Sequence, residues 1–190
     1  MSAYKYIGEA WKKPNEGLVR SLRTERLVKW RRGPAVTTIE HPTRLDRART
    51  LGYKAKQGVV VTRVRIIRGP MNVERPHSGR RPKRMGVYGI TSRMSTRRVA
   101  EERVAKKFPN MNLIGSYWVY SDGRYSWYEV ILVDTAHPAI LSDKNLSWVA
   151  APAQRGRVYK GLSAAGKKGR GLYNRGKGAE KVGKGRSVNF

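Results

Sequence analysis

The sequence predicts an α+β fold of three layers, in which a mainly antiparallel sheet lies between helices. One observation is an aromatic hairpin, because the runs 117–120 and 125–128 flank the turn-favouring dipeptide Asp122-Gly123. Another is that both faces of this hairpin are apolar, so both must be covered. A third is the set of helical segments before and after the β-branched run 58–68, which can supply that cover.

Two helices are predicted near the N-terminus, over residues 2–13 and 15–32. Apolar residues recur at helical spacing in the first segment, and Pro14 ends it. In the second segment apolar residues alternate with arginines and lysines, and Gly33-Pro34 ends it. We assign about half of the arginines in this second helix to a merely solvated face.

A short strand is predicted over residues 36–40, followed by a helix that Gly52 ends. Thr43 has Asp46 three residues after it, which resembles a capping arrangement at the start of that helix.

Residues 58–68 predict a strand with a basic face, because the alternation puts Arg63 and Arg65 opposite its apolar residues. The segment 69–89 that follows contains prolines and basic residues without apolar periodicity. A loop of this length inside a compact domain is usually functional or disordered.

A further helix is predicted over residues 95–108, where Arg97 and Glu101, and then Glu102 and Lys106, are four residues apart. Neighbouring helical residues point about 100° apart, so the two glutamates are not a catalytic pair. We interpret both as members of surface ion pairs.

The hairpin turn predicts that Trp118 faces Trp127 and that Tyr120 faces Tyr125. The alternation gives one face to Trp118, Tyr120, Tyr125, Trp127, Ile131 and Val133, and the other to Tyr117, Val119, Tyr128, Val130 and Leu132. These aromatic rings are also of the kind that stack single-stranded bases, but such platforms normally lie in positively charged grooves. The hairpin is the least basic part of the chain, which favours core packing.

Charge is the strongest functional signal, since 41 lysines and arginines against 13 acids give a formal net charge of +28. Such a surface needs a polyanion to neutralise it, and nucleic acid is the leading partner. If about 15 phosphates are neutralised, the salt slope is near −10 to −14, which describes tight but unspecific binding. Specificity then has to come from shape, which favours a folded RNA.

The charge is distributed unevenly and predicts the domain organisation. Residues 112–154 hold four acids and two bases, whereas residues 155–190 hold eleven bases, one acid and nine glycines. Alone, the C-terminal stretch has too few large apolar residues to order itself beyond local helix. We predict a globular α+β domain over 1–154, with an extended basic loop at 69–89, and a basic, Gly-rich RNA-binding extension over 155–190.

Several classes of chemistry find no support. The chain has no cysteine, and neither a secretory signal nor an apolar run of membrane-spanning length is apparent, which predicts an intracellular protein without a membrane partner. Its three histidines, His41, His77 and His137, are isolated from one another. The run 161–168 resembles a phosphate-binding loop, but Lys168 replaces the metal-binding Ser or Thr and no strand precedes it. We therefore predict no catalytic site, no metal, no cofactor and no small-molecule substrate.

Three ordered motifs carry a family resemblance. The run RARTLGYKAKQG at 47–58 resembles the signature of the archaeal and eukaryotic large-subunit ribosomal protein family called fifteen-e. The runs VAEER at 99–103, NLIGSYWV at 112–119 and EVILVD at 129–134 resemble its central part, and GLSAAGKKGRGL at 161–172 resembles its tail motif. The resemblance covers most of residues 2–172, and the short tail is similar to that of the archaeal members.

This resemblance implies a four-stranded antiparallel sheet between helices, and a permanent structural role on large-subunit ribosomal RNA beside neighbouring ribosomal proteins. It implies a cytoplasmic location in the ribosome and no catalysis. From charge and chain flexibility we predict that phosphates are clamped, and bases not read, by twelve residues. They are Arg47, Arg49, Lys54, Lys56, Arg75, Arg80, Arg81, Lys83, Arg84, Lys167, Lys168 and Arg170.

Two alternatives remain open at this point. One is an architectural, chromatin-like DNA-binding protein, for which the same positive charge would neutralise DNA phosphates. No motif that reads a DNA groove supports this alternative. An RNA-modifying enzyme would need a cofactor pocket or an acid–base pair, and none is apparent in the sequence.

Overall fold

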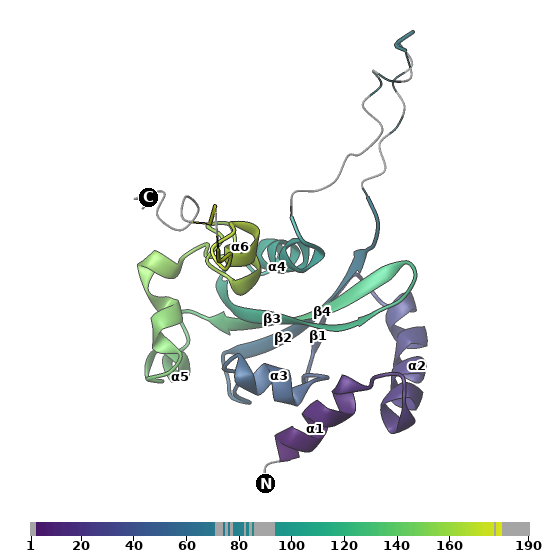
Figure 1. The fold of residues 1–190 in the computed structure, drawn as a ribbon. Helices are drawn as coiled ribbons and strands as arrows, with labels where there is room; N and C mark the ends of the chain where they lie inside the picture. The colour runs from purple at the N-terminus through teal and green to yellow at the C-terminus, as the bar shows by residue number, and fades with distance from the viewer. Residues whose placement is uncertain are drawn as a thin grey trace.

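The computed structural model describes residues 3–70, 74, 76, 78–81, 83, 85, 94–176, 178 and 179. At its centre lies a four-stranded antiparallel sheet with the strand order β1–β2–β4–β3 (Figure 1). The strands are β1 (Val36–Ile39), β2 (Val59–Ile67), β3 (Met111–Ser121) and β4 (Tyr125–Asp134). The predicted α+β class and the four-stranded sheet are confirmed.

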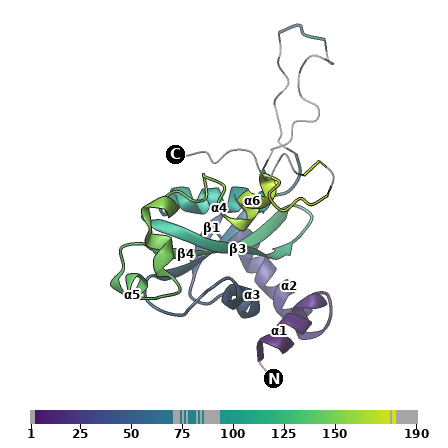
Figure 2. The same ribbon diagram turned by 60° about the vertical axis from the view of Figure 1, so that its left-hand side comes forward.

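Helices cover both faces of the sheet (Figures 1 and 2). On one face lie α1 (Ala3–Lys12), α2 (Gly17–Arg32) and α3 (Leu45–Thr50), and on the other lie α4 (Thr96–Lys107) and α6 (Ala164–Gly169). The short helix α5 (Pro138–Leu141) and the 3₁₀ turns η2 (Ser147–Ala150) and η3 (Pro152–Gln154) follow β4. This arrangement confirms the predicted three layers.

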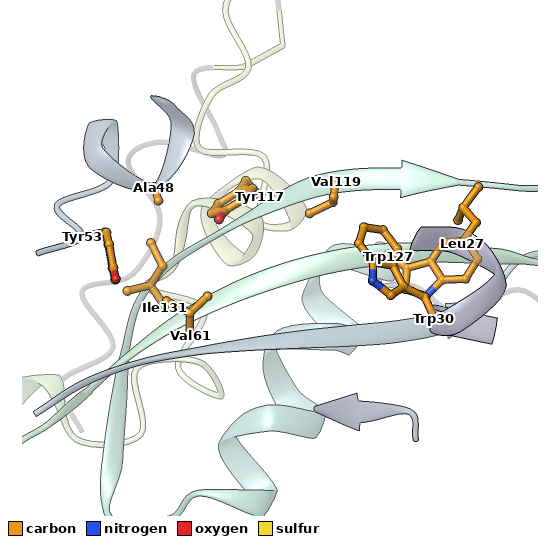
Figure 3. Packing of buried hydrophobic residues seen from close by; sticks show 9 residues of the cluster. All are labelled: Leu27, Trp30, Ala48, Tyr53, Val61, Tyr117, Val119, Trp127 and Ile131. Carbon is orange, nitrogen blue, oxygen red and sulfur yellow. The ribbon is translucent and has the colours of Figure 1, made fainter. Parts of the chain in front are cut away.

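The core on the α1–α3 face is aromatic. Trp127 of β4 is 1% exposed, and its ring centroid is 6.1 Å from that of Trp30 on α2 and 6.2 Å from that of Tyr120. Figure 3 shows the two tryptophans side by side at one end of the cluster, with Ile131 and Ala48 toward the other end. The core on the α4 face is mainly aliphatic and includes Val64, Ala100, Val104, Val130 and Leu132. Core packing of the hairpin aromatics, which we favoured over a base-stacking platform, agrees with the burial of Tyr117, Trp127 and Tyr128, but Trp118 is 36% exposed.

The predicted cap of α3 was wrong. The helix begins at Leu45 after Arg44, and no side chain accepts a hydrogen bond from its first turn. Thr43 instead donates its backbone N–H (3.0 Å) and its hydroxyl (2.5 Å) to the carboxylate of Glu129 on β4. A capping threonine would accept an N–H of the first helical turn, whereas Thr43 is held by the buried Glu129 through its two donors. Gly52, with φ of 97°, follows the end of the helix as predicted.

The predicted hairpin register was also wrong, because Asp122 precedes the turn and does not occupy its centre. Its backbone N–H donates to Tyr125 O (2.8 Å), and its Oδ1 accepts the N–H groups of Arg124 (2.8 Å) and Tyr125 (2.5 Å). Asp122 thus forms an Asx turn around Gly123-Arg124. As a result, Tyr120 faces Trp127 and not Tyr125.

An irregularity in β3 places some of its side chains on the face opposite to the one predicted. The register of β3 shifts between Trp118 and Tyr120, and one extra residue in a strand moves the preceding side chains to the opposite face. Tyr117 and Val119 therefore pack with Trp127 on the α1–α3 face, whereas Trp118 faces Tyr128. The predicted alternation along β4 is confirmed, because Trp127 and Ile131 lie on one face of the strand and Tyr128, Val130 and Leu132 lie on the other.

The ion pairs predicted on α4 were partly wrong. Glu101 is completely buried against β3, and Glu102 pairs with Arg98 (3.0 Å). The carboxylate of Glu101 accepts hydrogen bonds from the hydroxyls of Ser116 on β3 and Ser163 before α6 (both 2.5 Å). Arg97 does approach Glu101, at 3.8 Å. The helix turns Glu101 inward with Ala100 and Val104, so surface pairing is not available to it.

Candidate nucleic-acid interface

The predicted phosphate-binding residues Arg47 and Arg49 lie on α3, and both are exposed. Their helix is anchored by Ala48, which is completely buried, and the guanidinium of Arg49 lies 5.9 Å from the ring centroid of Tyr53. Both cations therefore project from a rigid support on the α1–α3 face.

Lys54 and Lys56 follow α3 and share one acidic partner. Their ammonium groups lie 2.9 and 2.6 Å from Oδ2 of Asp143, and Lys56 also donates to the carbonyl of Ala139 (2.7 Å). Hydrogen bonds from Lys56 and Lys54 hold the pKa of Asp143 well below its usual range. Part of the charge predicted for phosphates is thus already neutralised within the protein.

The loop between β2 and α4 lies largely outside the described residues. Of the five basic residues predicted there, Arg80, Arg81 and Lys83 are described and exposed. Arg75 and Arg84 lie outside the described residues.

The three predicted tail residues lie at α6, on the opposite face of the sheet from α3 (Figure 1). Lys167 and Lys168 occupy the last turn of α6 and Arg170 follows it, all exposed. None of the three has an acidic side chain within 4.0 Å among the described residues. Unlike Lys54 and Lys56, these cations keep their full charge for an external anion.

α6 itself is held firmly by the body of the protein. The Ser163 hydroxyl accepts the N–H of Gly166 and donates to the buried Glu101, so a single side chain caps the helix and anchors it. Gly166 could not be larger, because a Cβ there would lie 2.6 Å from Gly161 Cα. This close backbone crossing positions the cationic end of α6.

Arginines stacked on aromatic rings are a feature that the sequence reasoning missed. Guanidinium carbons lie 4.3 to 4.8 Å from ring centroids in four such pairs on the α1–α3 side of the sheet. The pairs are Arg23 on Tyr120, Arg44 on Trp11, Arg63 on Trp30 and Arg65 on Tyr125. Stacking restricts each flat cation, which lowers the entropic cost of binding an anion, but Arg44 is already paired with Asp46 (3.0 Å) and is less available. The two members of each pair are at least 33 residues apart in the sequence, so no local pattern could have revealed them.

Three titratable groups set the electrostatics behind this face, and two of them, Glu129 and Tyr117, are buried. Burial raises the pKa of Glu129, while the hydrogen bonds from Thr43 and Tyr117 and the charge of Arg63 oppose that shift. Burial also lowers the pKa of Arg63, an effect that Glu129 opposes and Arg26 adds to. The pKa of Tyr117 is raised by burial and by its bond to Glu129, so its phenol remains a donor.

Metal binding and membrane spanning find no support in the described part of the chain. No group of three or more His, Cys, Asp or Glu side chains there is arranged to hold a metal ion. None of the described helices combines the length and the apolar character needed to span a bilayer. What the geometry offers is dispersed cations on both faces of a rigid three-layer body.

Comparison with known proteins agrees with this geometry. A family model described as "Ribosomal L15" matches residues 2–189, which is almost the whole chain. The protein of Methanocella arvoryzae named large ribosomal subunit protein eL15 is 54% identical over 180 residues, covering 95% of this chain and 92% of that protein. Fold, charge and sequence together define a ribosomal protein. The chain belongs to the ribosomal L15e family, as its motifs predicted.

Proposed function

We propose that this protein is a structural constituent of the large ribosomal subunit that binds and stabilises folded large-subunit ribosomal RNA. The observation that carries the proposal is the position of exposed cations on opposite faces of one rigid body, at α3 and at α6. A body with phosphate contacts on two sides can hold separate RNA segments together, which is what a structural component of a folded RNA has to do.

The proposed contacts are with phosphates. Arg47 and Arg49 act from α3, Lys167, Lys168 and Arg170 act from α6, and the basic residues of the 69–89 loop add further contacts. Lys54 and Lys56 contribute less, because Asp143 competes for them. In this proposal residues 1–154 form the globular unit and residues 155–190 the RNA-binding extension. Neighbouring ribosomal proteins are further partners, and the location is the ribosome in the cytoplasm.

Sedimentation of native lysate through a sucrose gradient in high-salt buffer tests the proposal, with the chain followed by mass spectrometry. We expect stoichiometric retention in the large-subunit fraction. Removal by salt, or sedimentation with DNA, would overturn the proposal and favour the architectural DNA-binding alternative. Preference for folded RNA over duplex DNA at moderate salt separates the two functions with the purified protein.

A further inference from the structure

A cavity of about 720 Å³ lies where the end of α4, the start of β3, the end of β4 and residues 150–159 meet. Its volume is within the range of small-molecule sites, roughly 300 to 1,000 Å³. None of the twelve predicted phosphate-binding residues lines it. The cavity is therefore a feature that dispersed phosphate binding does not explain.

The lining of the cavity includes an exposed aromatic ring and several cations. Tyr159 lines the cavity and is 55% exposed, and its backbone N–H is fixed to Gly156 O (3.0 Å). Arg155 and Lys106, both exposed, also line it. An exposed ring beside cations is the combination that stacks a nucleobase and holds its phosphate.

A buried cation in the lining, Arg157, adds to the positive potential of the cavity. Arg157 is 8% exposed and donates to the carbonyls of Leu113 (3.0 Å) and Leu162 (3.4 Å), with its guanidinium 4.7 Å from the ring centroid of Trp148. Its Nε has no hydrogen-bond partner among the described residues. Arg157 is therefore held in place, and its charge favours an anionic ligand.

The cavity also contains an acceptor suited to the edge of a base. Asp134 lines it, and one carboxylate oxygen accepts the N–H of Ala136 (2.9 Å). No lysine or arginine of the described residues lies within 4.0 Å of this carboxylate. An ionised carboxylate only accepts hydrogen bonds, so its ligand must donate. Guanine is the common base with two adjacent donors on one edge, N1–H and the N2 amino group.

We propose that this cavity binds one unpaired guanine that is turned out of the RNA, with the base stacked on Tyr159 and its donor edge on Asp134. Arg155 and Lys106 hold the phosphates on either side. The inference rests on the proposed RNA-binding function and adds base recognition to it. Asp134 disfavours an acidic peptide in the same place, because its carboxylate would face another carboxylate.

Chemical probing of assembled large subunits tests this site. Subunits would be isolated from cells in which the full-length chain is wild type, Tyr159→Ala, Asp134→Asn or, as a control, Tyr173→Ala. Tyr173 is equally exposed (57%) but does not line the cavity. Kethoxal modifies N1 and N2 of accessible guanines. We expect one guanine, protected in the wild type and in Tyr173→Ala, to become several-fold more reactive in the other two variants.

Two results would overturn the proposal. One is an unchanged pattern of guanine reactivity although the variants sediment with the subunit. The other is exposure of an adenine or cytosine, detected with dimethyl sulfate, in place of a guanine. If the wild-type chain itself does not sediment with the large subunit, the proposed function fails, and the cavity is tested separately as follows.

Binding of the purified full-length protein to short RNA hairpins gives a readout independent of assembly. The hairpins carry a single bulged G, A, C or U, or no bulge, and affinity is measured by fluorescence anisotropy at 0.3 M salt, on the order of physiological strength. We expect the bulged G to bind best, and Tyr159→Ala to weaken it about 5- to 150-fold, the range that base stacking supplies. Equal affinity for all hairpins, or tighter binding of free GMP than of the bulged G, would contradict the site. Circular dichroism of each variant verifies folding.

Discussion

The two faces of the sheet each bury one glutamate that accepts hydrogen bonds from neutral donors, but among the described residues only Glu101 also has a cation within 4.0 Å. On the α1–α3 face, Glu129 receives hydrogen bonds from neutral donors, the backbone and hydroxyl of Thr43 and the phenol of Tyr117. On the α4 face, Glu101 is bonded to two serine hydroxyls, with Arg97 3.8 Å away. Each carboxylate ties a distant segment to the sheet, across 86 residues for Thr43 and 62 residues for Ser163. Positioning of both cationic surfaces thus depends on a buried acid.

The aromatic face is expected to contribute most to stability. Trp127→Ala removes a ring that contacts both Trp30 and Tyr120, and we expect a loss of about 3–5 kcal/mol in the free energy of unfolding. Leu132→Ala, completely buried on the α4 face, serves as the matched comparison, with a loss of about 2–5 kcal/mol. Urea titrations measure both. A clearly smaller loss for Trp127→Ala would show that the aliphatic face dominates.

Removal of the buried acid on the α4 face is expected to cost nearly as much. Glu101→Ala leaves Ser116 and Ser163 without their acceptor and removes the anion near Arg157, so we expect a loss of about 3 kcal/mol. Limited proteolysis should also cleave residues 155–171 faster. Glu102→Ala on the same helix breaks only the partly exposed pair with Arg98 and should cost under about 1 kcal/mol. Equal losses for the two variants would mean that the buried network adds no stability.

RNA binding should distinguish the cations of the two faces. Lys167→Ala with Lys168→Ala removes two unpaired charges, and we expect the slope of log affinity against log salt to become shallower by about 1.4–1.8. Lys54→Ala with Lys56→Ala should change the slope by less than about 1, because Asp143 already engages both ammonium groups. Filter binding to a large-subunit RNA fragment at several salt concentrations measures both slopes. The same change for the two double variants would contradict the competition by Asp143.

The pH dependence of stability should separate the two kinds of carboxylate. The folded-state pKa of Glu129 is raised above its ordinary value of 4.5, so its contribution is full below pH 4.5 and is lost as pH rises through the folded pKa. The pKa of Asp143 is lowered from 3.8, so its contribution is present above pH 3.8 and is lost as pH falls. Thermal melts from pH 3 to 8 should show that Glu129→Gln removes the decline on the alkaline side, while Asp143→Asn reduces the decline on the acid side. An unchanged alkaline slope in Glu129→Gln would refute its assignment.

The sequence predicted the helices, the strands and the three layers because their signals are local. The spacing of apolar residues, and helix-ending residues such as Gly33 and Gly52, can be read from neighbouring positions of a single helix or strand. Register and polar burial were predicted poorly because they depend on distant partners. The irregularity at Trp118 exchanges faces, and the destination of Glu101 depends on Ser163 far along the chain. At the candidate interface, charge pointed to the cations, but the competition by Asp143 and the arginine stacks exist only in three dimensions.

The strand order has a consequence for synthesis. β4 is the last strand to be made, yet it lies inside the sheet, between β2 and β3. β2 is complete at residue 67 and its partner only at residue 134. At a translation rate of about 5–20 residues per second, this interval lasts roughly 3 to 13 s. During that time one long edge of β2 and the apolar side of α2 lack their final partners. The incomplete nascent chain must therefore remain soluble until β4 has been synthesised. The excess of positive charge destabilises the finished fold, but in the nascent chain the same repulsion opposes non-specific collapse and self-association.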